Sequence, residues 1–127
     1  MTLVHHELCF GCGRVNLFGL LLEVEPAGAD AVAGRCFFKQ DHQGADRGVA
    51  HDGVVAAALA EAMALVCGPD ARATELELRL LAPAPIGSFL AVLATVERRE
   101  GAAAYAGASL AIEAGSPLAQ ARGTFRR

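Results

Sequence analysis

The segment Gly48-Val49-Ala50-His51-Asp52-Gly53 carries the strongest chemical signal in the sequence, because it leads into an apolar stretch expected to be helical. The first N–H groups of a helix lack a partner within it, and the helix dipole there favours negative charge. The Gly53 N–H is therefore a candidate donor to a carbonyl oxygen that becomes an oxyanion, and glycine lets a substrate approach closely. The alternative is structural, with Asp52 as the helix N-cap and Gly53 relaxing the turn. Physical chemistry alone favours this structural alternative.

Glu61 is the second signal, since it is the only charged residue between positions 54 and 67. Burying a carboxylate is costly unless it is paired or hydrogen-bonded. A partly buried glutamate can serve as a general base near neutral pH. Glu61 is then either a catalytic base or one half of an interface salt bridge, with Arg79 or Arg72 as its partner. Both interpretations stay open at this point.

Cys9 and Cys12 have a spacing found in metal sites, and His5 and His6 are close by, so that four such groups could bind zinc. A single Cys-x-x-Cys pair is a weak signal, however, because zinc sites commonly combine two separated pairs. We therefore expect no metal ion and no cofactor. Chelators are expected to leave folding and any activity unchanged.

One helix and six strands are expected to position these residues. The helix covers residues 54–67, with Asp52 as its N-cap and Gly68-Pro69 at its end. The expected strands cover residues 20–25, 31–38, 74–80, 89–98, 103–113 and 118–125. Because the helix is apolar nearly all round, it should be buried on most sides. This order predicts an α+β fold in which an antiparallel sheet wraps around one long central helix.

Length and composition predict a single domain over residues 1–127. Hydrophobic residues make up 54% of the chain and charged residues 20%, which argues against disorder. The mean hydropathy of +0.36 is high for a small protein and indicates a buried interface between subunits. The net charge of -3 and the pI of about 5.7 give no support for nucleic-acid binding.

No segment is long and apolar enough to span a membrane, because the most apolar stretch, residues 54–66, is short and interrupted by Glu61. The N-terminus lacks a basic region followed by an apolar core, so no signal peptide is expected. We expect a cytoplasmic protein whose cysteines are reduced thiols.

The N-terminal motif Cys9-Phe10-Gly11-Cys12-Gly13, followed by Asn16 and Gly19-Leu20, resembles the opening of many acyl-CoA thioesterases of the hotdog superfamily. It is similar in particular to the group of phenylacetyl-CoA thioesterases. The superfamily's core has His-Gly-Gly at the start of the helix and an acid farther along, which His51-Asp52-Gly53 and Glu61-Ala62-Met63 resemble. Further matches are His42-Gln43-Gly44 in the preceding loop and Pro83, Pro85 and Gly87 in a later turn.

The resemblance implies a hotdog fold and hydrolysis of an acyl-CoA-type thioester to a free acid and a thiol. The thioester carbonyl would lie at the helix N-terminus and accept from the Gly53 N–H, while a carboxylate on the helix, here Glu61, activates water or attacks directly. Gln43 would assist from the loop, and His51 would shape that loop. The site would form between two subunits of a homodimer or a dimer of dimers, with no membrane or nucleic-acid partner.

Two positions depart from the superfamily's pattern. Asp52 stands where the first of two glycines is usual, and Ala60 occupies the usual position of the catalytic acid. Glu61 follows one residue later, which on a helix is a rotation of about 100°. The alternative function is therefore a hotdog protein that binds an acyl thioester without hydrolysing it. A third option is a dehydratase-like enzyme that uses the His51-Asp52 pair, for which two residues are a thin basis.

Overall fold

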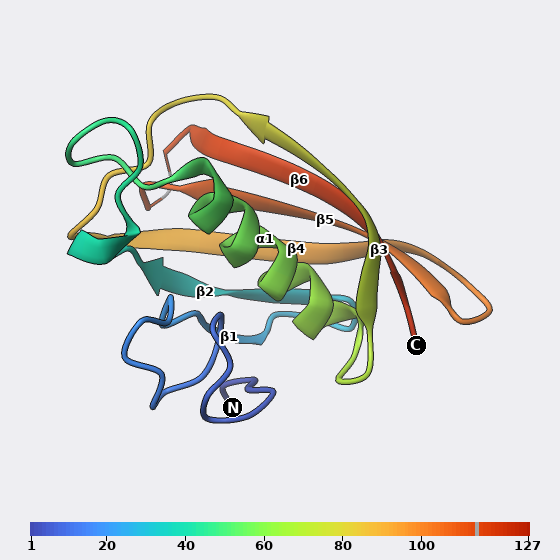
Figure 1. Ribbon diagram of the computed structural model, residues 1–127. Coiled ribbons are helices and arrows are strands. Elements are labelled where there is room, and N and C mark those ends of the chain that lie inside the picture. The colour runs from blue at the N-terminus through green and yellow to red at the C-terminus, as the bar shows by residue number, and fades with distance from the viewer. Residues whose placement is uncertain (114) are drawn as a thin grey trace.

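The computed structural model describes residues 1–113 and 115–127. In these residues the regular structure consists of one α-helix, six strands and a short 3-10 helix (Figure 1). The elements are β1 (Glu23–Pro26), β2 (Ala31–Phe37), η1 (Gln40–His42), α1 (Asp52–Cys67), β3 (Arg72–Leu80), β4 (Phe89–Glu100), β5 (Ala103–Ala111) and β6 (Pro117–Arg126). The predicted order of two strands, one helix and four strands is confirmed.

The six strands form one antiparallel sheet in the order β1-β2-β4-β5-β6-β3. β3, which follows α1 in the chain, lies at one edge and pairs with β6, whereas β1 lies at the opposite edge and pairs with β2. The sheet curves around α1, which contacts every strand from β2 to β6 (Figure 1). The predicted α+β arrangement, a sheet wrapped around one central helix, is confirmed.

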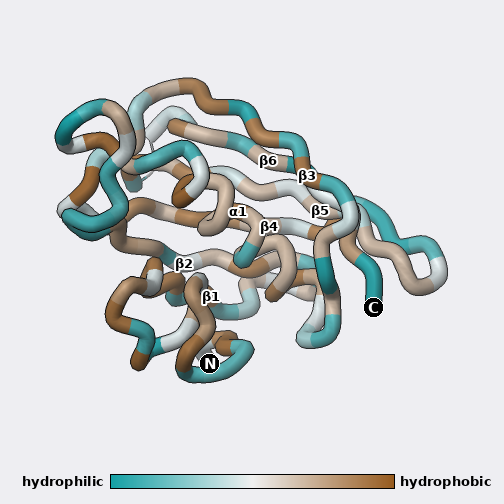
Figure 2. Tube along the Cα trace, viewed as in Figure 1, coloured by the Kyte–Doolittle hydropathy of each residue, from teal (hydrophilic) through white to brown (hydrophobic). Residues whose placement is uncertain are grey.

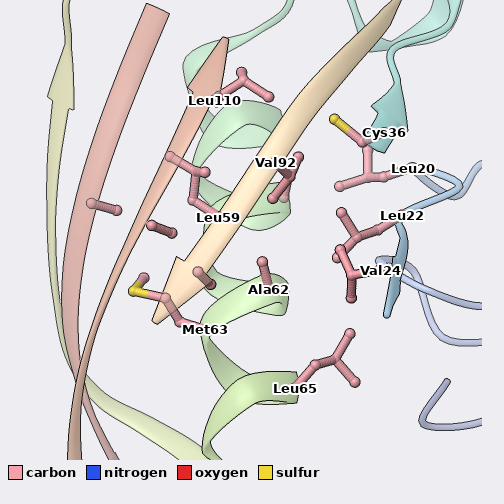
Figure 3. Packing of buried hydrophobic residues seen from close by; sticks show 14 of the residues in the cluster. Leu20, Leu22, Val24, Cys36, Leu59, Ala62, Met63, Leu65, Val92 and Leu110 are labelled. Carbon is pink, nitrogen blue, oxygen red and sulfur yellow. The ribbon is translucent and has the colours of Figure 1, made fainter. Parts of the chain in front are cut away.

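The core lies between α1 and the inner face of the sheet. Leu59 and Met63 of the helix are fully buried, in one cluster with Val92 of β4 and Leu110 of β5 (Figure 3). Most residues of α1 are hydrophobic, whereas hydrophilic residues gather at the β4–β5 hairpin and in the loop before the helix (Figure 2). Among the described residues, no helix combines the length and apolar character needed to cross a membrane.

The N-terminal end of α1 differs from the expectation. The helix begins at Asp52 rather than at residue 54, and its N-cap is His51. The predicted Asp52 cap is wrong because the Nδ1 atom of His51 already accepts the Gly53 N–H at 2.8 Å. The predicted end is confirmed, since Gly68 caps the last turn by donating its N–H to the Ala64 carbonyl at 3.1 Å.

The first strand is shorter than expected. Leu21 has a φ of 53°, a left-handed conformation that a strand does not accommodate, so β1 begins only at Glu23. Leu20 and Leu22 on either side of it are buried all the same. The segment before β1 therefore packs into the core as an irregular chain, and its backbone is held by hydrogen bonds to its neighbours.

Gly34 of β2 sets how closely β1 approaches. A Cβ atom added at this position would lie 1.8 Å from the Glu23 carbonyl oxygen, which is backbone and cannot move aside. We expect Gly34→Ala to destabilise the protein by about 3 kcal/mol or more, beyond the usual cost of overpacking. Gly107→Ala in β5 is the control, because its Cβ would come close only to the flexible end of Glu97 and would meet the Ala121 carbonyl oxygen at an ordinary 3.7 Å. Equal urea-unfolding midpoints for the two variants would contradict this expectation.

Candidate functional site

The loop before α1 is built around Gln43, one of the expected site residues. The Gln43 side-chain oxygen accepts the Gly48 N–H at 2.7 Å, and its Nε2 atom donates to the Gln40 carbonyl at 2.8 Å. Both ends of the side chain are thus engaged in holding the loop. Gln43 therefore braces the loop that leads into the helix.

His42 ties this loop to the N-terminal segment, a role that sequence reasoning missed. Its side chain is buried, its Nδ1 atom accepts the Lys39 N–H at 2.8 Å, and Nε2 lies 2.8 Å from the Phe18 carbonyl oxygen. Because a backbone N–H is a donor, Nδ1 must accept, and Nε2 therefore carries the proton that it donates to Phe18. A buried histidine with two backbone partners is a structural clamp.

The first turn of α1 presents His51, Asp52 and Gly53 to solvent, and the structure brings these three expected site residues together. The imidazole of His51 covers the Gly53 N–H, which therefore already has an acceptor. A substrate carbonyl can bind this N–H only after the exposed imidazole turns away. Through its contact with the Gly53 N–H, His51 forms the N-cap of α1.

Glu61 lies apart from this turn and faces the N-terminal segment. Its Oε2 atom is 2.8 Å from His5 Nδ1 and accepts from the Cys9 thiol at 3.0 Å, and the side chain is only 15% exposed. Eight residues separate Gly53 from Glu61 along α1, a rise of about 12 Å. The structure does not bring Glu61 together with the Gly53 N–H.

The partner expected for Glu61 is also different. Within this chain Glu61 pairs with His5 and not with Arg79 or Arg72, and a salt bridge across a subunit interface stays a prediction. Arg72 instead donates to the carbonyls of Ala71 and Pro69. The sequence offered His5 as a neighbour of the cysteines but carried no signal that the helix carboxylate would meet it.

Cys12 completes a group of four polar side chains with His5, Cys9 and Glu61. Their nitrogen, sulfur and oxygen atoms all lie within 4.8 Å of one another. Cys12 is buried, and its Sγ atom accepts the His5 backbone N–H at 3.2 Å. Burial and then the hydrogen bond to Glu61 raise the pKa of the Cys12 thiol, and the His5 N–H opposes that rise. His6 stays outside this group and accepts the Leu8 N–H.

Two glycines of the N-terminal motif are required by close packing. A Cβ atom on Gly11 would lie 2.4 Å from Glu61 Cγ, so the chain between the cysteines rests directly on the glutamate. A Cβ atom on Gly13 would lie 2.3 Å from the Glu7 carbonyl oxygen, within the turn that returns past Cys9. The alternation of glycine and cysteine is the sequence signal of a segment folded tightly onto α1.

No protein-family model matches the sequence, and no curated protein matches it either. Solved structures do match. A thioesterase-superfamily protein has a TM-score of 0.80 at 19% identity over 89% of this chain, which spans 60% of that protein's length. Zebrafish thioesterase superfamily member 2 has a TM-score of 0.72 at 21% identity, covering 82% of this chain and 79% of that protein. The PaaI protein from the phenylacetic acid degradation operon of E. coli has a TM-score of 0.73 at 16% identity, covering 82% and 81%.

These likenesses concern the arrangement of the backbone. Identities of 16–21% establish a shared architecture, and the six-stranded antiparallel sheet around one long helix is the hotdog fold of those proteins. The predicted hotdog fold is therefore confirmed. Fold alone does not transfer an activity, because one fold supports many different sites.

Proposed function

We propose that the protein binds acyl-CoA-type thioesters at the N-terminal end of α1 and hydrolyses them to a free acid and a thiol. The carrying observation is that the first turn of α1 is open to solvent at His51, Asp52 and Gly53, whereas the rest of the helix is buried or half-buried. A helix N-terminus concentrates N–H donors and positive dipole at one point. Such donors stabilise the oxyanion that forms when a thioester carbonyl is attacked.

The Gly53 N–H is the proposed donor to the carbonyl oxygen. Rotation of the His51 imidazole about its side-chain bonds releases this N–H, and the exposed ring has room to turn. Glycine at position 53 leaves the backbone open to a close approach. In this proposal His51 acts as a gate that satisfies the N–H until the substrate replaces it.

The proton acceptor of this proposal is Asp52 rather than Glu61. The Glu61 carboxylate is engaged by His5 and Cys9, whereas Asp52 is exposed on the same turn as Gly53. A carboxylate next to the oxyanion donor is placed to take a proton from an attacking water. The second candidate function is binding of the thioester without hydrolysis, which the engagement of Glu61 favours because the expected base is occupied elsewhere.

A thiol-release assay over a panel of acyl-CoAs tests the proposal. We expect turnover by the unmodified protein and a loss of about 10²-fold or more in Asp52→Asn, the usual effect of removing a general base. Asp70→Asn, which changes an exposed aspartate beyond the other end of α1, is the matched control and should keep full turnover. Acyl-CoA binding by calorimetry without any thiol release would instead establish the second candidate.

The proposal includes a homodimer formed through β3. Among residues 1–113 and 115–127 this edge strand pairs with β6 alone. It is nine residues long, and its Leu76 and Leu80 are 51% and 46% exposed. An open edge of this length with exposed leucines favours pairing with another strand. Antiparallel pairing of two β3 strands would extend the sheet across both copies, and a site shared between subunits requires such a contact. A dimer of dimers would need a further contact.

A further inference from the structure

We propose that His5, Cys9, Cys12 and Glu61 bind a zinc ion that fastens the N-terminal segment to α1. This inference concerns a site separate from the proposed thioester site, and it replaces the expectation that the protein holds no metal. The expectation rested on a single cysteine pair with His5 and His6 close by. The structure places His5 Nδ1 beside both thiols, leaves His6 outside the group and adds the carboxylate of Glu61, 49 positions beyond Cys12.

The spacing of the four side chains fits a tetrahedral ion. Zinc bonds of about 2.0–2.3 Å to nitrogen, oxygen and sulfur place neighbouring ligand atoms about 3.3–3.8 Å apart. His5 Nδ1 is 3.8 Å from Cys9 Sγ and 3.6 Å from Cys12 Sγ. Glu61 Oε2 is 2.8 Å from His5 Nδ1 and 3.0 Å from Cys9 Sγ, so the carboxylate needs only a small withdrawal to admit the ion.

The chemistry of the ligands selects zinc. Two sulfurs, one imidazole nitrogen and one carboxylate oxygen in a compact arrangement are the mixed donors that tetrahedral zinc accepts. Binding would release the Cys9 and Cys12 protons to solvent, because the thiolate is the ligand. The His5 backbone N–H already points at Cys12 Sγ at 3.2 Å, and a donor in that position stabilises a thiolate.

The polar groups are costly to bury without a common partner. His5 and Glu61 side chains are 18% and 15% exposed, and Cys12 is 2% exposed. The Nε2 atom of His5 is buried and has no hydrogen-bond partner among residues 1–113 and 115–127, so all polar contacts of the ring run through Nδ1. An ion at the centre would satisfy the four facing atoms at once.

The consequence for the fold is a link between distant parts of the chain. Three ligands come from residues 5–12, which contain no regular helix or strand, and the fourth comes from the middle of α1. Because the site does not exist in the unfolded chain, the free energy of binding the ion adds to the stability of the folded state. Gly11 keeps the two parts in contact, since any side chain there would push Glu61 out of the group.

Metal analysis of the full chain, purified without a histidine tag under reducing conditions, tests the inference. We expect stoichiometric zinc in the unmodified protein, a lower melting temperature after chelation and recovery when zinc sulfate is added back. Cobalt(II) added to the metal-free protein should give the intense thiolate-to-cobalt absorption of a tetrahedral site. None of these measurements depends on hydrolysis, so they remain decisive even if no thioester is turned over.

Substitutions locate the ion. Cys12→Ser should lose stoichiometric zinc, and Cys9→Ser, which alters a less buried position, should lose it too while the chain still folds. Cys67→Ser is the matched control, because this buried thiol at the end of α1 lies outside the group and should leave zinc content unchanged. If Cys12→Ser does not fold, Cys9→Ser and the cobalt titration decide the question.

Three results would overturn the inference. The first is a folded, reduced protein that takes up neither zinc nor cobalt. The second is equal loss of zinc in Cys67→Ser and Cys9→Ser, which would place the ion elsewhere. The third is a Cys9–Cys12 disulfide in protein purified under reducing conditions, seen as a mass two hydrogens lower, because it would consume both thiolates.

Discussion

Glu61→Gln is expected to lower the melting temperature by about 5–15 °C while leaving thioester turnover per folded molecule intact. The carboxylate pairs with His5 and accepts from the Cys9 thiol in a largely buried position. Glutamine keeps the shape but loses the charge, and hydrogen bonds to a charged group contribute about 1.5–3 kcal/mol. Thermal unfolding and thiol release on the same preparation measure both effects.

If Glu61 is a zinc ligand, a chelator should lower the melting temperature of the unmodified protein. The difference between this melting temperature and that of Glu61→Gln should then become smaller. Glu25→Gln is the control, because Glu25 is exposed and its contact with the N-terminal amine is worth little. An unchanged melting temperature together with a loss of turnover of about 10²-fold would restore Glu61 as the catalytic base.

Arg79→Glu is expected to dissociate the proposed dimer and abolish turnover with it. The charged residues of β3 are Arg72 at its start and then Glu75, Glu77 and Arg79, which alternate with leucines. Antiparallel pairing centred on Leu78 sets Glu77 opposite Arg79 twice and leucine opposite leucine at three places, with no like charges opposed. Centring on Leu76 sets Glu75 opposite Glu77 twice. Centring on Glu77 sets Glu75 opposite Arg79 twice but also sets Glu77 opposite its own copy. Like charges directly opposite each other are destabilising, so the register centred on Leu78 is favoured.

In that register Arg79→Glu turns two attractive pairs into two repulsive ones, at a cost of about 1–4 kcal/mol. This raises the dimer dissociation constant about fivefold to a thousandfold, which light scattering over a range of micromolar concentrations detects. The double variant Glu77→Arg with Arg79→Glu restores opposite charges and should restore both dimer and turnover. Arg127→Glu makes the same charge change at the C-terminus as a control. A double variant as monomeric as Arg79→Glu would rule out this register.

The architecture was predictable because it follows from local patterns. The alternation of residues 74–80, the apolar run of α1 and the glycine and proline turns between strands each report on burial within a few neighbouring residues. The wrong predictions concern the start of β1 and the N-cap of α1, where a single dihedral angle or a single acceptor atom determines the local structure. Leu21 adopts a left-handed conformation, and the His51 imidazole competes for a cap, and neither leaves a pattern in the sequence.

The candidate site was predictable only in part, for a different physical reason. His51, Asp52 and Gly53 are adjacent in sequence, so their meeting at the start of α1 follows from where the helix begins. Glu61 meets His5 across more than fifty residues, and the direction of its side chain depends on how the irregular N-terminal segment packs. The signal in the sequence is the glycines beside the cysteines, which are needed because the segment packs too closely on α1 for a side chain. Hydrophobic periodicity does not detect such a requirement.

The two edges of the sheet differ in how readily a strand of another chain can pair with them. β1 has only four residues, and the last of them is Pro26. The Val24 carbonyl already accepts the Leu3 N–H, so few backbone groups of β1 are free to pair with another chain. β3 has nine residues, and in the part of the chain that the structure describes it pairs with β6 alone, so its other side is open. Pairing through one edge about a two-fold axis closes after two copies, whereas two open edges would allow fibres. The N-terminal segment thus blocks pairing at the β1 edge. Its detachment from β1 would expose a second edge at which another chain could add a strand.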